Sequence, residues 1–177
     1  MRAFILFLVL IPLAISAQDE KTVSQWGAIK YFEGSWIGES TGKAGEGKGE
    51  RTYEYIMNRA YLHYKNIMKF EPQENNPKGE VHEDWGFFSW DNNRQIIVLR
   101  QFNIEKFTNQ FIADSISTDG KTLLFTSESS ENAPPRLTAR YIFEIKDENT
   151  FIETFELAFP GNPYSCWMTN TWRRKTN

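Results

Sequence analysis

Hydrophobic and polar residues alternate with a period of two along most of the chain after Trp36. This alternation is typical of β-strands that turn one face to a core and the other to solvent. The breaks fall at turn sequences, such as residues 91–93, 119–120 and 161–163. The pattern predicts strands at residues 36–41, 50–57, 60–70, 80–90, 94–102, 109–117, 121–128, 138–145, 150–158 and 164–174.

A helical pattern precedes these strands, over residues 19–32. Val23, Trp26 and Ile29 recur at roughly helical spacing, and the segment begins with the acids Asp19 and Glu20. Acidic residues in a first turn favour a helix start. The pattern predicts a short N-terminal helix.

Ten short strands joined mostly by tight turns form an antiparallel meander. An open sheet of this size would leave two unpaired edges, and closure into a barrel removes them. A barrel of about eight to ten strands is wide enough to hold one small ligand. We therefore predict an all-β fold: a closed up-and-down antiparallel β-barrel of about ten strands with a short N-terminal helix.

The first 17 residues have the composition of a secretory leader. MRAFILFLVLIPLAISA contains one cation, Arg2, then an apolar run, then small residues ending at Ala17. The apolar run is shorter than the about 20 residues of a comfortable membrane span. We expect cleavage near Ala17, a single domain over residues 18–177 without a membrane span, and a secreted or periplasmic protein; an uncleaved anchor is the alternative.

The charge of the chain argues against two classes of partner. It has 20 Lys and Arg against 23 Asp and Glu, a net charge of −3 at pH 7, and both signs are mixed along it. It has no basic stripe of the kind that nucleic-acid binding requires, and no polybasic tract for anionic lipid. The one cysteine, Cys166, cannot form an intrachain disulfide, so the core alone must stabilise the fold.

Gly34 and Trp36 stand at the start of the first strand, in YFEGSWIGES. A glycine lets the chain turn sharply from helix into strand, and the tryptophan can then fill the barrel floor. The last strand carries Arg173 and Arg174, and it lies beside the first strand in a closed barrel. An arginine stacked on Trp36 would gain about 0.5–2 kcal/mol and help to close the barrel; we assign this structural role to Arg173.

A Gly-x-Trp on the first strand, a short helix before it and a late arginine resemble the calycin superfamily of lipocalins and fatty-acid-binding proteins. The runs FEGSWIGES and GERTYEYI look more like the bacterial calycin-like and nitrobindin-type barrels than like true lipocalins. The resemblance covers nearly the whole chain after the leader. It implies an up-and-down barrel that binds a hydrophobic small molecule or, in nitrobindin-like members, haem.

Haem binding in the nitrobindin-like proteins depends on a histidine of a late strand. Here the two histidines, His63 and His82, lie in the first half of the chain, and none follows Tyr141. Tyr164 and Cys166 could in principle bind iron, although both also fit as ordinary strand residues. We therefore expect no cofactor.

Two apolar faces carry a charged residue. Arg100 shares a face with Ile96 and Phe102, and Glu153 shares one with Phe155. If these faces point inward, both charges are buried and need partners. One interpretation is a clamp in which Arg100 binds the anionic head of a ligand; an internal Arg–Glu pair and the opposite register are the alternatives.

His82 and Asp84 share a face of one strand, while Glu83 points to the other side. A zinc site needs three or four ligands, so His63 would have to join them from the neighbouring strand. Solvent-facing polar residues near a strand start are the simpler interpretation. We predict no metal site.

These patterns favour an exported barrel that binds a hydrophobic or amphipathic small molecule with an anionic head. The alternatives are a barrel enzyme, an isomerase or hydrolase with His82 or His63 as base and Arg100 as anion holder, a haem protein, and a filled barrel that acts through its surface. No catalytic residue is assigned, and the oligomeric state is not indicated. The expected ligand-binding residues are Tyr53, Tyr55, His63, His82, Arg100, Phe102, Glu153, Phe155 and Trp167.

Overall fold

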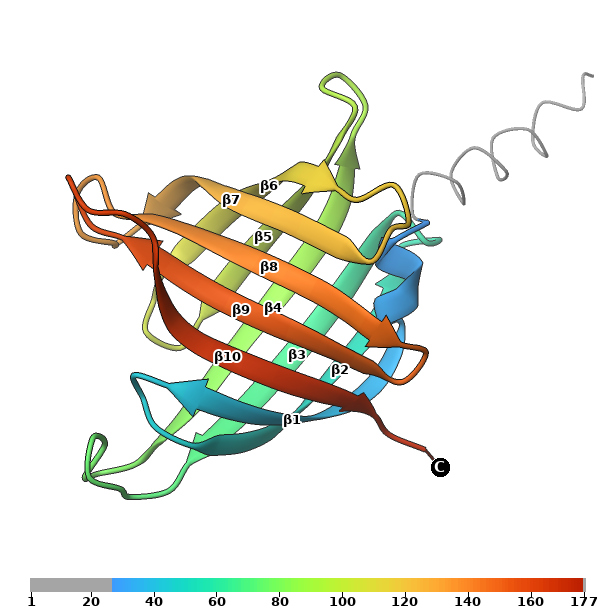
Figure 1. Ribbon diagram of the computed structural model, residues 1–177. Helices are drawn as coiled ribbons and strands as arrows, with labels where there is room; N and C mark the ends of the chain where they lie inside the picture. The colour runs from blue at the N-terminus through green and yellow to red at the C-terminus, as the bar shows by residue number, and fades with distance from the viewer. Residues whose placement is uncertain (1–26, 177) are drawn as a thin grey trace, which may run out of the picture.

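Ten antiparallel strands close into one barrel in the structure, a computed structural model that describes residues 27–176 (Figure 1). Each strand pairs with its neighbours in the sequence, and β1 pairs with β10 to close the sheet. This confirms the predicted all-β, up-and-down barrel. The strands are β1 (Gly34–Gly42), β2 (Gly47–Ile56), β3 (Tyr61–Phe70), β4 (Glu80–Asp91), β5 (Ile96–Asn103), β6 (Thr108–Ile116), β7 (Thr122–Glu131), β8 (Thr138–Asp147), β9 (Thr150–Ala158) and β10 (Ser165–Arg174).

Over residues 27–32, the part of the predicted N-terminal helix that the structure describes, the prediction of a regular helix is wrong. A single 3₁₀ helix, η1 (Ile29–Phe32), precedes β1, and Ala28 at its start makes no side-chain capping hydrogen bond. Short 3₁₀ turns are common connectors. Residues 19–26 of the predicted helix, and the predicted leader with its cleavage point, lie outside the described residues. No helix within residues 27–176 is long and apolar enough to cross a membrane.

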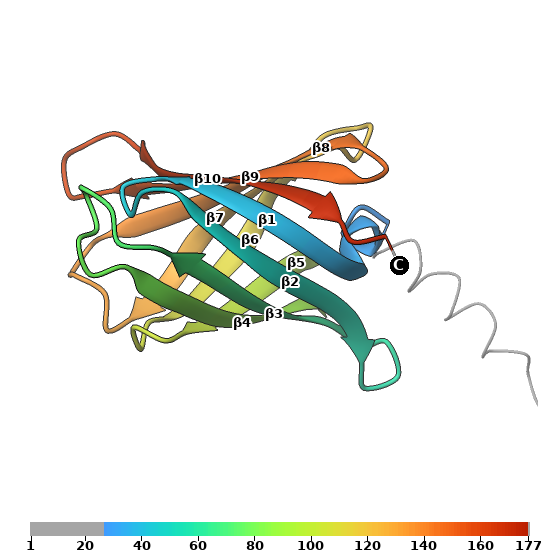
Figure 2. The ribbon, with the colours of Figure 1, turned by 90° about the horizontal axis from the view of Figure 1, so that it is seen from below.

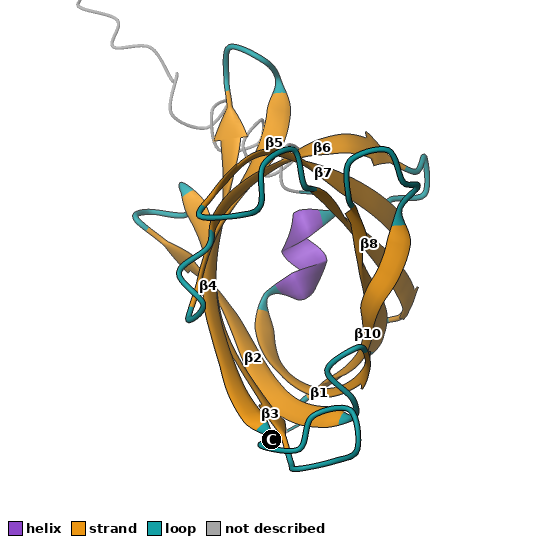
Figure 3. Ribbon diagram, turned by 90° about the vertical axis from the view of Figure 1, so that its left-hand side faces the viewer, coloured by secondary structure: helices purple, strands orange, loops and turns teal. Residues whose placement is uncertain are grey.

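The two ends of the barrel differ. At the end that we call the closed end, η1 lies across the lumen, as the view through the barrel in Figure 3 shows. The strand connections at this end, residues 57–60, 92–95, 117–121 and 148–149, are tight. The opposite, open end carries the connections at residues 43–46, 71–79, 104–107, 132–137 and 159–164.

Aromatic side chains fill the closed end. The Phe32 ring of η1 lies 5.0 Å from the Phe151 ring and 5.4 Å from that of Phe143, both in edge-to-face geometry. The Trp36 indole is fully buried, and its Nε1 donates a hydrogen bond to the Phe32 carbonyl at 2.7 Å. Buried edge-to-face rings add about 0.5–1.5 kcal/mol per pair beyond their burial. Trp36 is therefore part of the buried core at the closed end.

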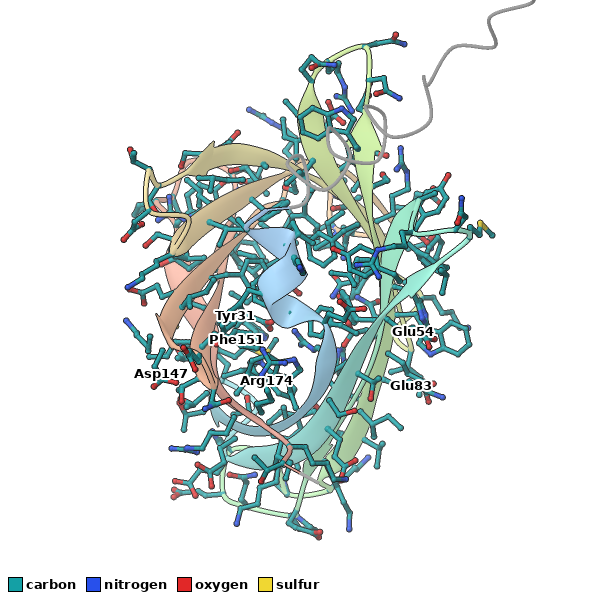
Figure 4. The ribbon with its side chains drawn as sticks, turned by 90° about the vertical axis from the view of Figure 1, so that its right-hand side faces the viewer. Tyr31, Glu54, Glu83, Asp147, Phe151 and Arg174 are labelled. Carbon is teal, nitrogen blue, oxygen red and sulfur yellow. The ribbon has the colours of Figure 1, made fainter. Side chains whose placement is uncertain are left out.

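An arginine does stack on Trp36, but it is Arg174. Its guanidinium lies 4.2 Å from the indole and donates to the carbonyls of Glu33 at 2.7 Å and Tyr31 at 2.8 Å. Figure 4 shows Tyr31 and Arg174 together beside η1, and in Figure 2 the C-terminal end of β10 runs beside the start of β1. The assignment to Arg173 is wrong because that residue points outward, where it pairs with Glu39 at 3.2 Å.

The register explains this difference of one residue. Trp36 is the direct cross-strand partner of Arg174, so both side chains lie on the inner face. A shift of one residue moves a side chain to the opposite face of a sheet. Gly34 has a φ of +119°, and a Cβ there would lie 3.0 Å from Arg174 Nη1. The predicted glycine turn is therefore needed both for its backbone angle and for the approach of the arginine.

Candidate ligand cavity at the open end

A cavity of about 600 Å³ occupies the open half of the barrel. The cavity walls nearer the open end are largely apolar, and the residues deeper in the lumen are polar. The apolar residues include Met68, Phe70, Phe155, Leu157, Trp167 and Met168, and the deep polar residues include Asn66, His82, Gln101, Tyr141 and Asn170. Small-molecule sites in proteins commonly combine apolar walls with a few fixed polar groups.

The floor of the cavity belongs to a layer of polar side chains that crosses the lumen, which we call the polar layer. It separates the cavity from the aromatic closed end, because its members lie at the middle of their strands. Each comes from a different strand: Arg51, Asn66, Asp84, Gln101, Tyr141, Glu153 and Asn170.

An ion pair between Arg51 and Glu153 anchors one side of the polar layer. Arg51 Nη1 contacts Glu153 Oε2, and Nη2 donates to Oε1 at 3.2 Å, with relative exposures of only 5% and 1% for the two side chains. Burial alone would lower the pKa of Arg51, but the Glu153 carboxylate keeps it well above its usual value. The guanidinium also lies 4.3 Å from the Trp172 ring and donates to the Tyr53 hydroxyl at 3.0 Å. These groups supply the hydrogen bonds that a buried charge requires.

Gln101 and Asp84 form the other side of the polar layer. Gln101 Nε2 lies 3.0 Å from Asp84 Oδ1 and 3.0 Å from the Tyr141 hydroxyl. Asn66 links the two sides, because its amide donates to Asp84 at 2.6 Å while its oxygen accepts from Arg51 at 3.3 Å. A continuous network of this kind holds its members in one arrangement.

His82 lines the cavity and connects the polar layer to the rim. Its Nε2 lies 3.2 Å from Asp84 Oδ2, and its Nδ1 lies 2.8 Å from Glu105 Oε1 in the connection between β5 and β6. Burial alone would lower the pKa of His82, but the hydrogen bonds to Asp84 and Glu105 raise it to about 10. His82 is therefore an imidazolium at neutral pH, with both ring nitrogens donating to carboxylates.

Asn170 is the member of the floor with an unmet hydrogen-bonding atom. It is 2% exposed, and its Nδ2 donates to Glu153 Oε1 at 3.0 Å. Its Oδ1 accepts no hydrogen bond from residues 27–176, and the same is true of the hydroxyl of Ser40, its direct cross-strand partner on β1. A buried polar atom without a partner costs about 1–3 kcal/mol, so this part of the floor has an unfilled capacity for hydrogen bonding.

The predicted ligand-binding residues divide into three groups. Some line the cavity, some face the lumen without lining it, and some lie on the outer surface. The first group is His82, Phe155 and Trp167; the second is Tyr53, Tyr55 and Glu153; the third is His63, Arg100 and Phe102.

The expected inward face of Arg100 and Phe102 is wrong. Arg100 is exposed and Phe102 is 48% exposed, while Leu99 and Gln101 point into the lumen. Arg100 donates instead to the Ser89 hydroxyl at 3.0 Å. The anion clamp therefore does not form, and the inward Glu153 has Arg51 as its partner.

His63 lies on the outer face of β3 as well. It is flanked by the inward Leu62 and Tyr64 and lies 3.5 Å from Glu54, which Figure 4 shows on the outside of the barrel wall. It therefore cannot join His82, which lines the cavity. Within residues 27–176, no group of three or more His, Cys, Asp or Glu side chains is placed to hold a metal ion.

Tyr53, Tyr55 and Glu153 face the lumen but do not line the cavity. Tyr53 and Tyr55 follow Arg51 toward the closed end of β2, and the Tyr55 ring lies 3.9 Å from the Arg59 guanidinium. Glu153 is covered by its ion pair with Arg51. The expectation that His82 and Asp84 face solvent is also wrong, because Asp84 is 2% exposed.

Sequence reasoning missed most of the polar layer, although one signal was present. Arg51 alternates with Tyr53 and Tyr55 in GERTYEYI, so it lies on the same face as two aromatic residues. Gln101, Asn66 and Asn170 offer no comparable signal, because neutral polar residues are frequent on both faces of a strand.

The described residues do not fit a bound haem. His82 is the one histidine that lines the cavity, and carboxylates occupy both of its ring nitrogens. Cys166 is exposed, and the Tyr164 ring packs 4.3 Å from the Arg140 guanidinium. None of these side chains presents a free ligand atom to the cavity.

Fold and site together define a closed ten-stranded antiparallel β-barrel that is filled at one end and hollow at the other. No protein-family model matches the chain, and no curated protein matches it. Among solved structures it is similar to Rv2717c from M. tuberculosis, with 17% sequence identity and a TM-score of 0.63 over 86% of this chain and 98% of that one. At this identity the likeness shows a shared fold.

Two other barrels show a weaker likeness. EF1p2_mFAP2b bound to DFHBI has a TM-score of 0.42 at 10% identity, over 84% of this chain and 97% of that one. The redesigned barrel mFAP1 bound to DFHBI has a TM-score of 0.36 at 13% identity, over 83% and 98%. Likenesses this weak carry no argument about function.

Proposed function

We propose that the open end of this barrel binds a small amphipathic molecule. The observation that carries the proposal is the cavity of about 600 Å³, with apolar walls such as Phe155 and Leu157 above a polar floor. A cavity of this size and lining is typical of small-ligand sites. The polar layer supports the proposal because it holds the floor in place before a ligand arrives.

An enzyme with a histidine base has less support. A general base must be unprotonated and within reach of its substrate. His82 is held as an imidazolium between Asp84 and Glu105, and both His63 and Arg100 lie outside the lumen. Binding without chemistry is therefore the function that the geometry favours.

Native mass spectrometry of protein purified from a cell extract tests this proposal. We expect a discrete additional mass without visible colour, and a Soret band would indicate haem instead. A bare chain that stays bare after exposure to mixed lipids and porphyrin would contradict ligand binding.

A matched pair of variants on β3 places the ligand in the cavity. Met68 lines the cavity and Ile67, the preceding residue, is 42% exposed on the outer face. Met68→Trp should fill the cavity and remove the additional mass, whereas Ile67→Trp should retain it. Overpacking costs about 1–3 kcal/mol, so circular dichroism must show that each variant is folded; Met168→Trp is the substitute if Met68→Trp does not fold.

We also propose that the protein is exported and related to the calycins. Residues 1–17 support export by their composition, and the contact of Arg174 with Trp36, next to Gly34, supports the kinship. The intact mass of the protein from the periplasm or medium tests export, because cleavage near Ala17 would leave a chain that begins at about Gln18.

A further inference from the structure

One acceptor atom on the floor of the cavity has no donor among residues 27–176. Asn170 lines the cavity at 2% exposure, and its amide nitrogen is already bound to Glu153 Oε1 at 3.0 Å. This bond fixes which end of the amide is nitrogen, so the remaining atom is the oxygen, a pure acceptor. No residue within 27–176 donates to it.

The strand beside Asn170 does not fill this need. Ser40 is its direct partner on β1, and its hydroxyl also makes no hydrogen bond within the described range. On the other side Asn170 pairs with Glu153, whose carboxylate can accept hydrogen bonds but not donate them. Neither neighbouring strand therefore supplies a donor for Asn170 Oδ1, and the Asn170 side chain lines the cavity.

The charges around the cavity do not favour an anion. The deep cations are both neutralised: Arg51 by Glu153, and His82 by Asp84 and Glu105. At the rim, Lys43 is accompanied by the carboxylates of Glu80 and Glu105. An anionic head would meet carboxylates without an unpaired deep cation to compensate for its desolvation.

We propose that the polar head of the ligand is a hydrogen-bond donor without negative charge, an alcohol, amine or amide, and that Asn170 Oδ1 accepts its hydrogen bond. The inference rests on the proposed binding function and names the class of ligand for that same cavity. Asn170 is then the residue that determines which head group binds.

Four probes with matched unbranched alkyl chains test the proposal on the unaltered protein: decan-1-ol, decylamine, decanoate and decyl methyl ether. They share an apolar chain and differ in head group, so their dissociation constants isolate the donor and the charge. We expect the alcohol and the amine to bind roughly tenfold more tightly than the ether and decanoate, the size of effect that one satisfied buried hydrogen bond gives. The fluorescence of Trp167 at the cavity wall, together with native mass spectrometry, can report binding.

The outcomes separate this inference from the proposed function. Equal affinities, or tightest binding of decanoate, would overturn the inference and leave the binding function in place. Failure of all four probes would count against the amphipathic binding function, and the inference would fall with it.

Asn170→Leu gives the second arm of the test. It removes the acceptor while keeping a side chain of similar size, so the preference for the alcohol over the ether should disappear. Thr171→Val is the matched control, because Thr171 is the next residue and lies on the opposite face of β10. A preference that survives Asn170→Leu would overturn the assignment of Asn170, and if that variant does not fold, the four-probe series decides.

Discussion

The two halves of the barrel lumen are built from the same strands but differ in how their side chains fill the space. In the closed half, rings such as Phe32, Trp36 and Phe151 are fully buried and pack against one another. In the open half, the walls that continue from these strands leave a cavity of about 600 Å³. The difference indicates a division of labour, in which the closed half stabilises the fold and the open half is free to bind.

The polar layer is what makes this division possible. An aromatic core that continued through the barrel would leave no room for a ligand, and a cavity that reached η1 would remove much of the core. Arg51 and Glu153 fill the cross-section with groups that satisfy one another. The same layer offers Asn170 to the cavity, so it serves both halves.

The largest effect is expected when the polar layer loses one charge. Arg51→Met leaves Glu153 buried without its cation, and breaking a buried pair in this way costs about 3–5 kcal/mol of unfolding free energy. Urea denaturation of the variant measures the loss. The double variant Arg51→Met with Glu153→Leu should recover most of the lost unfolding free energy. A double variant as unstable as the single one would show that the loss comes from the missing ion pair and not from the unpaired charge of Glu153.

The comparison of the two ends is tested next by truncating one apolar residue in each. Ile29 in η1 is fully buried, so Ile29→Ala should lower the unfolding free energy by about 2–5 kcal/mol. Trp167 at the cavity is 40% exposed, and Trp167→Ala should change stability by no more than about 0.5 kcal/mol while weakening ligand binding. Similar losses of stability at both ends would contradict the division of labour.

Neighbouring arginines give a smaller and sharper test of how the closed end is held. Arg174→Ala removes the stacking on Trp36 and three hydrogen bonds to carbonyls, for an expected loss of about 1–3 kcal/mol. Arg173→Ala removes an exposed pair with Glu39 and should cost less than about 0.5 kcal/mol. Thermal denaturation of both variants would show the contrast, and equal losses would contradict the closing role of Arg174.

The same pair shows how far the sequence alone could go. Alternation and turn chemistry were enough for a closed ten-stranded barrel, because both are local properties. The choice between Arg173 and Arg174 depends on a cross-strand register, Trp36 with Arg174, that no local pattern contains.

The cavity was harder to predict for a related reason. Residues 96–99 are four consecutive apolar residues, so the sequence does not show which face of this strand points inward. In the structure Val98 is buried as well as Ile97 and Leu99. That choice placed Arg100 inside, whereas the structure exposes Arg100 and buries Gln101. In FIETFELAF the alternation is regular, and Glu153 and Phe155, which share a face in that pattern, both face the lumen.

A further expected effect concerns the pH dependence of the open end. The pKa of His82 is raised from 6.5 to about 10 by hydrogen bonds to Asp84 and Glu105 that outweigh its burial. A raised pKa in the folded state stabilises the protein fully below the unfolded value of 6.5, and this contribution is lost as the pH rises toward 10. The unfolding free energy should therefore decline between about pH 6.5 and 10, with Tm falling by about 2–4 °C for each kcal/mol lost.

Two histidine variants assign this decline to the cavity. His82→Gln should flatten the alkaline side of the profile, because the titrating group is gone, whereas His63→Gln on the outer face keeps His82 and should retain the alkaline decline. On the acid side, burial would raise the pKa values of Asp84 and Glu105, but the hydrogen bonds from His82 lower them. The contribution of these two carboxylates to stability is therefore lost only as the pH falls below the usual carboxylate range.

Hydrogen exchange gives a local measurement of the same effect. Since Glu105 joins the rim to β4 through His82, the protection of amides 104–107 against exchange should fall over the same alkaline range. An alkaline decline that persists in His82→Gln would show that the open end is not held by this imidazolium.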